Sequence, residues 1–460
     1  MQPLITNDAV VFGILMSILA FVFYTSNLQH KTWQRIYTFL PPILVCYFLP
    51  ALLHWPLGLI AYEWYDPGIY DFLREQGHTI SDGANPAEFL RKLSMAGTEV
   101  EGADAYLRGS RLYFMASRYL LPASLILLCL SIDFKGVLNL GSKTLIMFGA
   151  ATLGIVIGGP IALLIITNLF PNLIGVSPDE LWKGLSTIAG SWIGGGANQT
   201  AMKEIFNVGS GLFATMIVVD VVVANIWLAV LLSGVNFSKR IDRWLKADAS
   251  SIESLKEKVE AYQNSIAKIP STKELFILMG VAFGSVGLSH LLADGIVPLM
   301  DSIREQLVAW RLNSLLSGFF WLIVFSTTIG VALSFSKARR LEGLGASKWG
   351  AVFIYILVTT IGMQMDIGSV LQNLGLFAIG IIWMLTHVII LLVVAKIIRA
   401  PFFFVAVGSQ ANVGGAASAP VVASAFSPAL APVGALMAVL GYALGTYMAI
   451  VCAFLMQGVV

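Results

Sequence analysis

Glycines and small polar residues interrupt two apolar segments of this chain, and their types suit the binding of an anion or of a hard cation. The first segment, residues 181–206, reads LWKGLSTIAGSWIGGGANQTAMKEIF, and the second, residues 400–426, reads APFFFVAVGSQANVGGAASAPVVASAF. Each is long enough to be a transmembrane helix, but consecutive glycines at membrane depth leave backbone groups that lipid cannot satisfy. Two interrupted hydrophobic segments in corresponding positions of two halves indicate the binding site of a secondary transporter.

The two breaks predict a site for a small solute. We expect a helix to begin after each break, with Asn198 and Ser418 as N-caps, so that two positive helix ends meet near the middle of the membrane. Such helix ends bind carboxylate groups in transporters. The residues expected to contact the solute are Ser191, Gly194, Gly195, Gly196, Asn198, Gln199, Gly414, Gly415 and Ser418. The alternative is that the polar residues only satisfy the freed backbone groups.

Oxygen atoms near the same breaks predict a site for a coupling ion. Asp220 lies in the apolar stretch MIVVDVVVANIW, and a carboxylate at the centre of a membrane helix costs about 2.5 to 3.5 kcal/mol. We therefore expect Asp220 to bind sodium or a proton, the alternative being a structural hydrogen bond. The expected coupling residues are Asp220, Asn225, Ser409, Gln410 and Asn412, and the expected sodium ligands are Asp220, Asn198 and Asn412. Asn225 lies about 140° round the helix from Asp220, so both cannot face one site.

The composition is that of a polytopic, all-α membrane protein. Of the 460 residues, 57% are hydrophobic and only 12% are charged, and the mean hydropathy is +0.82. These values exceed what a soluble domain carries. The net charge of +2 argues against a nucleic-acid partner. Cys46, Cys129 and Cys452 all lie in apolar stretches, so we expect neither a disulfide framework nor a metal site of cysteines.

Basic residues favour re-entrant hairpins at the two interrupted segments. If residues 181–206 crossed the membrane once, the next span would deliver Lys239, Arg240 and Arg243 to the outer face, against the positive-inside rule. A hairpin that enters from and returns to the outer face keeps this cluster in the cytoplasm. Each arm of about a dozen residues is roughly 18 Å long and reaches the middle of a ~30 Å hydrocarbon core. The second hairpin would enter from the cytoplasm, and both chain termini would lie outside.

The hydrophobic pattern predicts two inverted repeats, each with five crossings and one hairpin. The expected crossings are 9–24, 36–53, 112–132, 144–167 and 212–234, then 274–292, 314–335, 349–365, 376–397 and 429–456. The scaffold helices of the repeats would be residues 1–54 and 274–336, and the cores 112–234 and 349–460. An acidic extracytoplasmic insertion is expected at 55–111, with a short helix at 86–95, and a cytoplasmic linker at 235–273. Around the hairpins, ATMIVVDVVVANI matches ALMAVLGYALGTY, which places Asp220 opposite Gly441 and Asn225 opposite Thr446.

The elements YLLPASLILLCLSIDFKGVLNLG, AGSWIGGGANQTAM and VVDVVVANIW resemble the YjcL-like family of integral membrane proteins, catalogued as domain of unknown function 819. That family is similar in plan to the glutamate:sodium and 2-hydroxycarboxylate:sodium symporters, whose five-helix repeats carry Gly-rich re-entrant hairpins. The resemblance implies an elevator-type transporter in the bacterial inner membrane, working as a homodimer with a scaffold and a mobile core. The tips here read GGGAN and GGAAS, with no substrate-binding arginine signature, so the identity of the substrate does not carry over.

These observations predict an ion-coupled secondary transporter of a small carboxylate, amino acid or short peptide, with sodium preferred to a proton. The alternative is a cation/proton antiporter without an organic substrate. An enzyme is not expected, because nothing in the sequence positions His387 near Ser409 as a dyad and no second membrane aspartate accompanies Asp220. His387 is instead expected to be a packing residue, and Lys203 and Glu204 a solvated pair at the outer interface.

Overall fold

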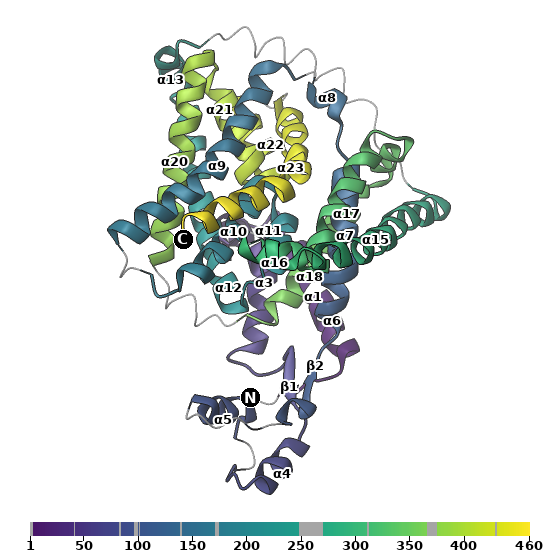
Figure 1. Cartoon of the computed structure of the whole chain (residues 1–460). Helices are drawn as coiled ribbons and strands as arrows, with labels where there is room; N and C mark the ends of the chain where they lie inside the picture. Colours follow the sequence, from purple (N-terminus) through teal and green to yellow (C-terminus); the bar gives the residue numbers. More distant parts are fainter. Residues whose placement is uncertain are drawn as a thin grey trace. The chain divides into compact units, whose positions relative to one another are not determined.

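The fold is mostly helical, and the computed structural model describes most of the chain. The described residues are 3–40, 42–81, 84–95, 100, 102–138, 140–170, 174–247, 270–310, 312–365, 375–427 and 430–460. Contacts group the chain into two units, one of Met1–Arg118 with Tyr355–Ile367 and one of Tyr119–Ile354 with Gly368–Val460. The first unit holds the N-terminal helices and a polar insertion, and the second holds both glycine-rich segments (Figure 1).

Long apolar helices make this chain a multi-pass membrane protein. Within the described residues, seven helices are long and apolar enough to cross a membrane, or up to nine if each of two bent helix pairs is one span. The seven are α1 (Asp8–Ser26), the helix Leu112–Leu130, α9 (Ser142–Leu169), α12 (Ser210–Val235), α15 (Thr272–Asp301), α20 (Gly375–Ile398) and Val433–Gly458 of α23 (Ala431–Gly458). Each overlaps a crossing predicted from the hydrophobic pattern. The shorter α17 (Gly318–Ser334) and α18 (Ala346–Gly362) overlap two further predicted crossings.

The crossing predicted at residues 36–53 falls on a bent pair of helices, which together are long and apolar enough for one span. The first, α2 (Lys31–Phe39), is attached to α1 through an edge-to-face contact between Trp33 and Phe21, whose ring centroids are 5.7 Å apart. The second, α3 (Pro42–His54), begins at a proline. Proline has no backbone N–H and is favoured at the first position of a helix, where that group would lack a partner, although α3 also carries Pro50 in its interior. The chain therefore starts a new helix at Pro42.

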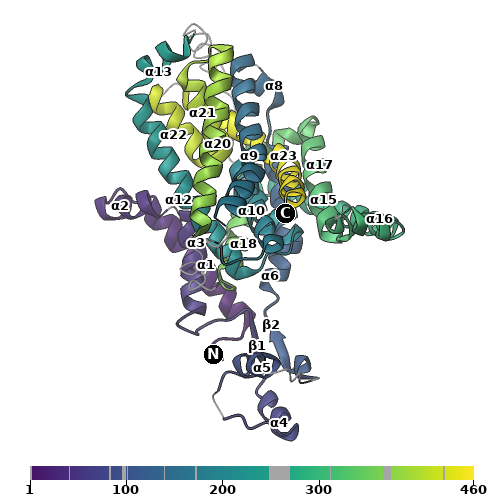
Figure 2. The same cartoon turned by 60° about the vertical axis from the view of Figure 1, so that its left-hand side comes forward.

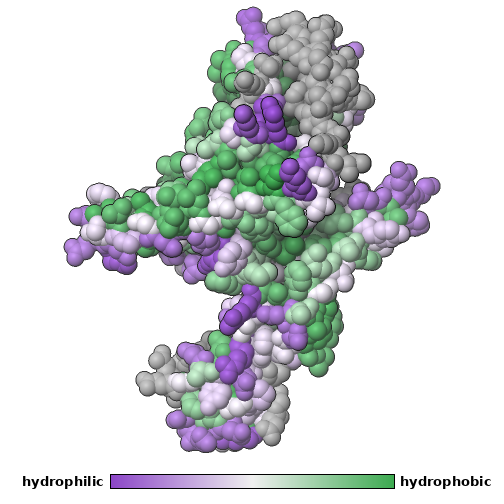
Figure 3. All heavy atoms as spheres, turned by 90° about the vertical axis from the view of Figure 1, so that its right-hand side faces the viewer, coloured by the Kyte–Doolittle hydropathy of each residue, from purple (hydrophilic) through white to green (hydrophobic). Residues whose placement is uncertain are grey.

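The insertion after α3 folds around its own small core in the first unit. Strands β1 (Glu63–Tyr65) and β2 (Leu107–Gly109) pair antiparallel, and α4 (Gly68–Glu75), α5 (Pro86–Met95) and the short helix Ala103–Tyr106 lie between them in sequence. Helix α5 confirms the predicted helix at 86–95, whereas the strands were not predicted. The buried residues are Ile69, Leu73, Ile80 and Ala103. Hydrophilic side chains gather over this segment in Figure 3, while hydrophobic side chains cover much of the remaining visible surface.

The helix Leu112–Leu130 continues into the second unit as α7 (Leu121–Leu130), which packs against α15 and α17. Glycine allows this close packing, since a methyl group added at Gly330 of α17 would lie 2.8 Å from Cβ of Cys129. Short helices join the long ones: α8 (Phe134–Leu138), α13 (Ser238–Leu245), α16 (Arg304–Ala309), Asn313–Leu316 and Lys337–Leu344. Within the linker predicted at 235–273, residues 248–269 lie outside the described part of the chain.

Helices α9 and α20 lie side by side in Figures 1 and 2 and pack closely against each other in the second unit. Trp383 of α20 donates a hydrogen bond from Nε1 to the carbonyl oxygen of Ile155, 2.8 Å away. Methyl groups added at Gly158 and Gly159 would lie 2.6 and 2.8 Å from atoms of the same indole ring. Small residues thus let the two backbones approach, as is common between membrane helices.

Gly158→Ala should destabilise the protein because the added methyl group overlaps the Trp383 ring, and overpacking a tight core typically costs about 1 to 3 kcal/mol. The matched control is Gly149→Ala on the same helix, where nothing lies within 4 Å of the added methyl group. Thermal unfolding in detergent should show a lower midpoint for Gly158→Ala only. Equal midpoints for the two variants would mean that α9 and α20 are not packed in this way.

Candidate functional site

The first glycine-rich segment folds as a helical hairpin of α10 (Pro178–Gly194) and α11 (Gly196–Ile205). Gly195 turns the chain with φ +76° and ψ −173°, a backbone conformation that is essentially restricted to glycine. The arms run back along each other, because the ring centroids of Trp182 and Phe206 lie 5.2 Å apart at the open end. Near the tip, a methyl group added at Gly190 would lie 2.6 Å from the Asn198 carbonyl oxygen.

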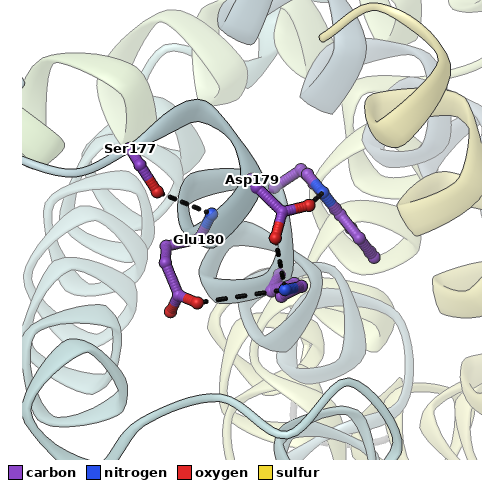
Figure 4. A network of polar contacts seen from close by, with 5 residues as sticks. Ser177, Asp179 and Glu180 are labelled. Atoms are coloured by element: carbon purple, nitrogen blue, oxygen red, sulfur yellow. Dashed lines mark hydrogen bonds and ion pairs between the residues drawn. The ribbon is translucent and has the colours of Figure 1, made fainter.

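The start of α10 is fixed by side chains at the open end of this hairpin. Ser177 is the N-cap and accepts a hydrogen bond from the Glu180 N–H at 3.3 Å, and Pro178 occupies the first helical position. Asp179 accepts hydrogen bonds from Trp182 and Lys183, and Figure 4 shows this network from close by. Acidic residues in a first turn also interact favourably with the helix dipole.

The second glycine-rich segment folds as a similar hairpin of α21 (Phe402–Val413) and α22 (Gly415–Phe426). The break lies at Gly414, and Gly415 has φ +57°. The ring centroids of Phe403 and Phe426 are 5.4 Å apart at the open end. Near the tip, the Ser418 hydroxyl donates to Oε1 of Gln410 at 2.7 Å. The same order of elements therefore occurs twice: a long helix, a hairpin and a second long helix.

The two hairpin tips meet on α23. A methyl group added at Gly441 would lie 2.5 Å from the carbonyl oxygen of Ile193, just before the first break, and 3.6 Å from that of Ala411, just before the second. The first hairpin also touches α23 at Gly445, where an added methyl group would lie 2.5 Å from Cα of Gly194. The predicted convergence of the two glycine-rich tips is thus present in the structure.

The hairpins reach this point from opposite ends of α23. Phe206, at the open end of the first hairpin, has its ring centroid 6.2 Å from that of Phe454, near the end of α23. The second hairpin passes Gly434, near the start of α23, where an added methyl group would lie 2.3 Å from the Ala419 carbonyl oxygen. The two hairpins therefore point in opposite directions along one helix.

The predicted N-caps are wrong. Gly195 and Gly414 occupy the N-cap positions of α11 and α22, and neither provides a side-chain cap. Asn198 and Ser418 lie within the following helices, because a single glycine is enough to turn each chain and the second arm starts at once. The first N–H groups of a helix have no partner inside it. The first N–H groups of α11 and α22 therefore have neither an intrahelical partner nor a side-chain cap.

Asp220 of α12 is bound by three donors from the first hairpin. Trp192 Nε1 donates to Oδ1 at 2.7 Å, and the Ser191 hydroxyl and Gln199 Nε2 donate to Oδ2 at 2.6 and 3.0 Å. Asp220, Trp192 and Gln199 are all buried. Hydrogen bonds to a charged group are each worth about 1.5 to 3 kcal/mol. This carboxylate therefore fastens both arms of the hairpin, one on each side of Gly195, to α12.

Asn198 fastens the same tip to α23. Its Nδ2 donates to the Gly194 carbonyl oxygen at 2.9 Å, and its Oδ1 accepts from the Thr446 hydroxyl at 2.6 Å. The Thr446 hydroxyl lies 3.0 Å from that of Thr327 on α17, and next to this pair the Thr328 and Tyr447 hydroxyls lie 2.7 Å apart. A chain of hydroxyl groups thus runs from the tip of the first hairpin to α17.

Ser409 of the second hairpin lies in a buried network with His387. The Ser409 hydroxyl is 2.8 Å from Nε2 of His387 and accepts a hydrogen bond from Trp227 Nε1, also at 2.8 Å. His387 Nδ1 is 3.0 Å from the Ala151 carbonyl oxygen, so the neutral ring donates there and accepts from Ser409 through Nε2. The expectation that nothing brings His387 near Ser409 is wrong. His387 binds a backbone carbonyl group through Nδ1, where the histidine of a hydrolase triad binds a carboxylate. The polar side-chain atoms of His387 and Ser409 are all engaged in hydrogen bonds.

The other polar residues of the second hairpin differ in how well they are paired. Asn412 accepts from Thr152 at 2.8 Å and donates to the carbonyl oxygens of Gly408 and Phe148 at 3.1 and 3.3 Å. Gln410 accepts from Ser418 through Oε1, but its buried Nε2 has no hydrogen-bond partner among the described residues. A buried donor without a partner costs about 1 to 3 kcal/mol. Most such groups in proteins are paired, so this one requires an explanation.

Two predictions about individual residues differ from their positions in the structure. Asn225 does not join the Asp220 network, since its amide donates to the Val221 carbonyl oxygen of its own helix at 2.8 Å. Lys203 and Glu204 do form an ion pair, at 2.9 Å, but it is not solvated, because their side chains are only 7% and 10% exposed. The packing of α11 against neighbouring helices buries them. The second arm of the first hairpin thus carries two mutually neutralised charges.

The residues predicted for sodium are all engaged in hydrogen bonds in this conformation. Asp220 accepts from three donors, Asn198 accepts from Thr446, and Asn412 accepts from Thr152. No group of three or more His, Cys, Asp or Glu side chains that could hold a metal ion occurs in the described part of the chain. A cation at Asp220 would therefore have to displace donors of the first hairpin.

Sequence reasoning missed several partners of the predicted residues. Trp192 and Trp227 each donate an indole N–H to the networks, and Thr152 and Thr446 each bind an asparagine. A signal was present for the tryptophans, because a buried indole N–H usually finds an acceptor. Trp227 follows Asp220 by two helical turns, which places both on one face of α12.

Comparisons with known proteins agree with the resemblance noted in the sequence. The model of the family DUF819, described as a protein of unknown function, matches residues 105–459. The chain is also similar to the uncharacterized membrane protein YjcL of Bacillus subtilis (strain 168). The two are 23% identical over 349 residues, which are 74% of this chain and 82% of that protein.

Asp220→Leu should lower the free energy of unfolding by several kcal/mol, because it leaves the donors of Ser191, Trp192 and Gln199 without an acceptor and each unpaired buried donor costs about 1 to 3 kcal/mol. Asp220→Asn should cost less, because it keeps one acceptor oxygen and the Gln199 amide can rotate. Thermal unfolding in detergent, with Asn225→Leu on the same helix as control, checks this order. Equal losses for the two Asp220 variants would contradict it.

Proposed function

This chain belongs to the DUF819 family, and we propose that it is an ion-coupled secondary transporter of a small organic solute. The solute would be a carboxylate, an amino acid or a short peptide, and sodium rather than a proton would be the coupling ion. Transport would follow elevator-type alternating access. The observation that carries this proposal is the meeting of two glycine-broken hairpins on α23 from opposite ends.

The helix order supports two inverted repeats as the architecture. The first core would comprise the helix Leu112–Leu130, α9, the first hairpin and α12, and the second α18, α20, the second hairpin and α23. Opposed hairpins are what an inverted repeat generates, since its halves are related by an axis in the membrane plane. Each hairpin would then be re-entrant. Glycine turns at membrane depth are tolerated there because they are enclosed by protein.

Charges at the open ends of the hairpins support the proposed orientation. The Phe402 N–H at the start of the second hairpin donates to Asp242 of α13 at 2.7 Å, and α13 also carries Lys239, Arg240 and Arg243. By the positive-inside rule this end would be cytoplasmic. The first hairpin begins with Asp179 and Glu180 at the opposite end. Both chain termini would accordingly lie outside, in the plasma membrane of a bacterium.

The solute class follows from the two helix starts. Helices α11 and α22 begin at the meeting point without side-chain caps, so their N–H groups and positive dipole ends suit an anionic group. The backbone can be approached there because glycines line the turns. A carboxylate is the common anionic group of small metabolites that such paired helix ends would bind.

Asp220 would couple the ion to transport, because a cation and the donors of the first hairpin would compete for its carboxylate. With no cation bound, its carboxylate oxygens are satisfied by Ser191, Trp192 and Gln199. A sodium ion or a proton at Asp220 would replace some of these hydrogen bonds and release the first hairpin from α12. Cation occupancy would thereby be linked to hairpin mobility, and a ligand shifts such an equilibrium only by its differential affinity for the two states. A cation/proton antiporter without organic solute is the alternative, and it would require only the Asp220 part of the site.

A homodimer forms part of the proposal. Helix α15 leaves Phe276, Leu291 and Leu299 between 60% and 74% exposed within the single chain. In a membrane this apolar surface would face lipid or a second copy of the chain. Scaffold helices that dimerise would hold still while the hairpin-bearing core moves.

Proteoliposomes with an imposed sodium gradient test the function directly. The protein should accumulate a radiolabelled member of a panel of carboxylates and amino acids, and Asp220→Asn should abolish this uptake while the protein stays folded. Asn225→Ala is the control and should transport normally, because its amide bonds only to its own helix. Proton movement driven by sodium with no organic solute present would instead support the antiporter.

Gly195→Leu should block uptake, because its backbone conformation costs a residue other than glycine about 1 to 3 kcal/mol and the side chain would fill the tip. Gly141 is a matched control for strain alone, with φ 92° and ψ 162° at the start of α9 and nothing within 4 Å of an added methyl group. Gly141→Leu should retain uptake per folded molecule. Normal uptake by Gly195→Leu would remove this tip from the transport path.

A further inference from the structure

We propose that the second hairpin alone supplies the side chain that recognises the solute, through the free amide donor of Gln410, whereas the first hairpin serves the coupling ion. This inference rests on the proposed transport function. It assigns recognition of the solute to the tip of the second hairpin and ion coupling to the tip of the first. The ligand group that Gln410 would bind is a carboxylate oxygen. The argument depends on the pairing state of each polar side chain at the two tips.

Gln410 is a buried donor that nothing in the described structure accepts from. Its side chain is 1% exposed, Oε1 accepts from Ser418 at 2.7 Å, and Nε2 has no partner. If the amide were rotated, Nε2 would donate to the Ser418 hydroxyl oxygen and Oε1 would be left without a donor. In either orientation one amide atom stays unpaired. Such a group is explained when a ligand completes its hydrogen bonds.

The Gln410 amide lies against the start of α22. A methyl group added at Gly414 would lie 2.2 Å from Oε1 of Gln410 and 1.6 Å from the Ser418 hydroxyl oxygen, so the amide sits directly over the backbone at the break. Gly414 gives α22 no side-chain cap, and Ala416 in its first turn is exposed. The Gln410 amide and the uncapped start of α22 thus lie together at the break, where an anion would meet both the side-chain donor and the positive helix end.

The first hairpin offers no equivalent donor. Ser191 and Gln199 are bound to Asp220, and Asn198 is bound to Gly194 and Thr446 at its two ends. A solute could take these side chains only by breaking the bonds that fasten the hairpin. The polar side chains of this tip therefore respond to what occupies Asp220, and its contribution to solute binding is confined to its backbone.

Two chemical consequences follow for the solute. An amide donor is neutral and adds no charge to the site, so the net charge of the bound solute is balanced by the helix ends and by the coupling cation. A donor also distinguishes an acceptor from a donor at the same place. The carboxylate should therefore be preferred to the corresponding ammonium compound of the same size, which has donors only.

The pairing of Gln410 in the ligand-free protein can be tested by replacing either of two glutamines, Gln410 or Gln199, with methionine. Gln410→Met removes the unpaired donor together with one hydrogen bond, from the part-buried Ser418 hydroxyl, and should therefore change the thermal midpoint of the ligand-free protein little. Gln199→Met removes a donor from Asp220 and should lower it by several degrees. Equal losses in the two variants would overturn the inference, because they would mean that Nε2 of Gln410 is paired before the solute arrives.

Ligand binding tests the assignment itself. Purified full-length protein would be titrated with acetate, succinate, malate, glutamate and alanine in the presence of sodium, with thermal stabilisation as the readout. For the compound that stabilises the wild type, Gln410→Met should weaken binding about tenfold, as expected for one lost hydrogen bond to a charged acceptor, and Gln410→Glu should weaken it further by repulsion. The matched first-hairpin variant Ser191→Ala should change sodium dependence more than solute affinity.

The outcomes separate this inference from the proposed function. Unchanged solute affinity in Gln410→Met, with binding to the wild type intact, would overturn the role of Gln410 and leave transport standing. Failure of every carboxylate to stabilise the wild type would overturn the proposed solute class. In that case the comparison of Gln410→Met with Gln199→Met still decides whether the second hairpin holds a free donor.

Discussion

The architecture of the second unit depends on one buried carboxylate and the three donors that satisfy it. Asp220 could not remain in the apolar α12 without partners, because an isolated charge in such surroundings is strongly disfavoured. Its partners come from both arms of the first hairpin, so satisfying the charge also fixes the turn at Gly195. Two turns further along α12, Trp227 binds Ser409 of the second hairpin. One face of α12 therefore holds both hairpins, one through a charge and the other through neutral groups.

Helices α12 and α23, which follow the two hairpins in sequence, contact them through different chemistry. Where α12 has Asp220, α23 has Gly441, and the missing side chain is what lets the backbones of both hairpins approach. Where α12 has Asn225, which bonds within its own helix, α23 has Thr446, which binds the tip of the first hairpin. One helix thus supplies polar groups and the other supplies space.

Much of the fold was predictable because it follows from local pattern. The lengths of the apolar segments predicted most of the crossings. The glycines that interrupt two of these segments predicted both hairpins and their meeting point. The N-caps could not be predicted, since whether one residue or three form a turn depends on the packing of both arms. The contact between His387 and Ser409 joins two helices whose rotation is set by tertiary packing. Lys203 and Glu204 were predicted to be exposed because charged pairs usually are. Their burial follows from the packing of α11, which the sequence does not reveal. Strands β1 and β2 are three residues each, too short to show alternation.

The threonine hydroxyls between α17 and α23 bear on how one helix could travel past the other. Thr327 and Thr328 face Thr446 and Tyr447, yet the hydroxyls of Thr327 and Thr328 also lie 3.0 and 2.6 Å from carbonyl oxygens one turn back in α17. Each of these two hydroxyls would therefore keep an acceptor within α17 if its partner on α23 moved away. Displacement of α23 along α17 would leave neither Thr327 nor Thr328 without a hydrogen bond. The interface between α17 and α23 therefore resists sliding far less than an interface held by ion pairs would.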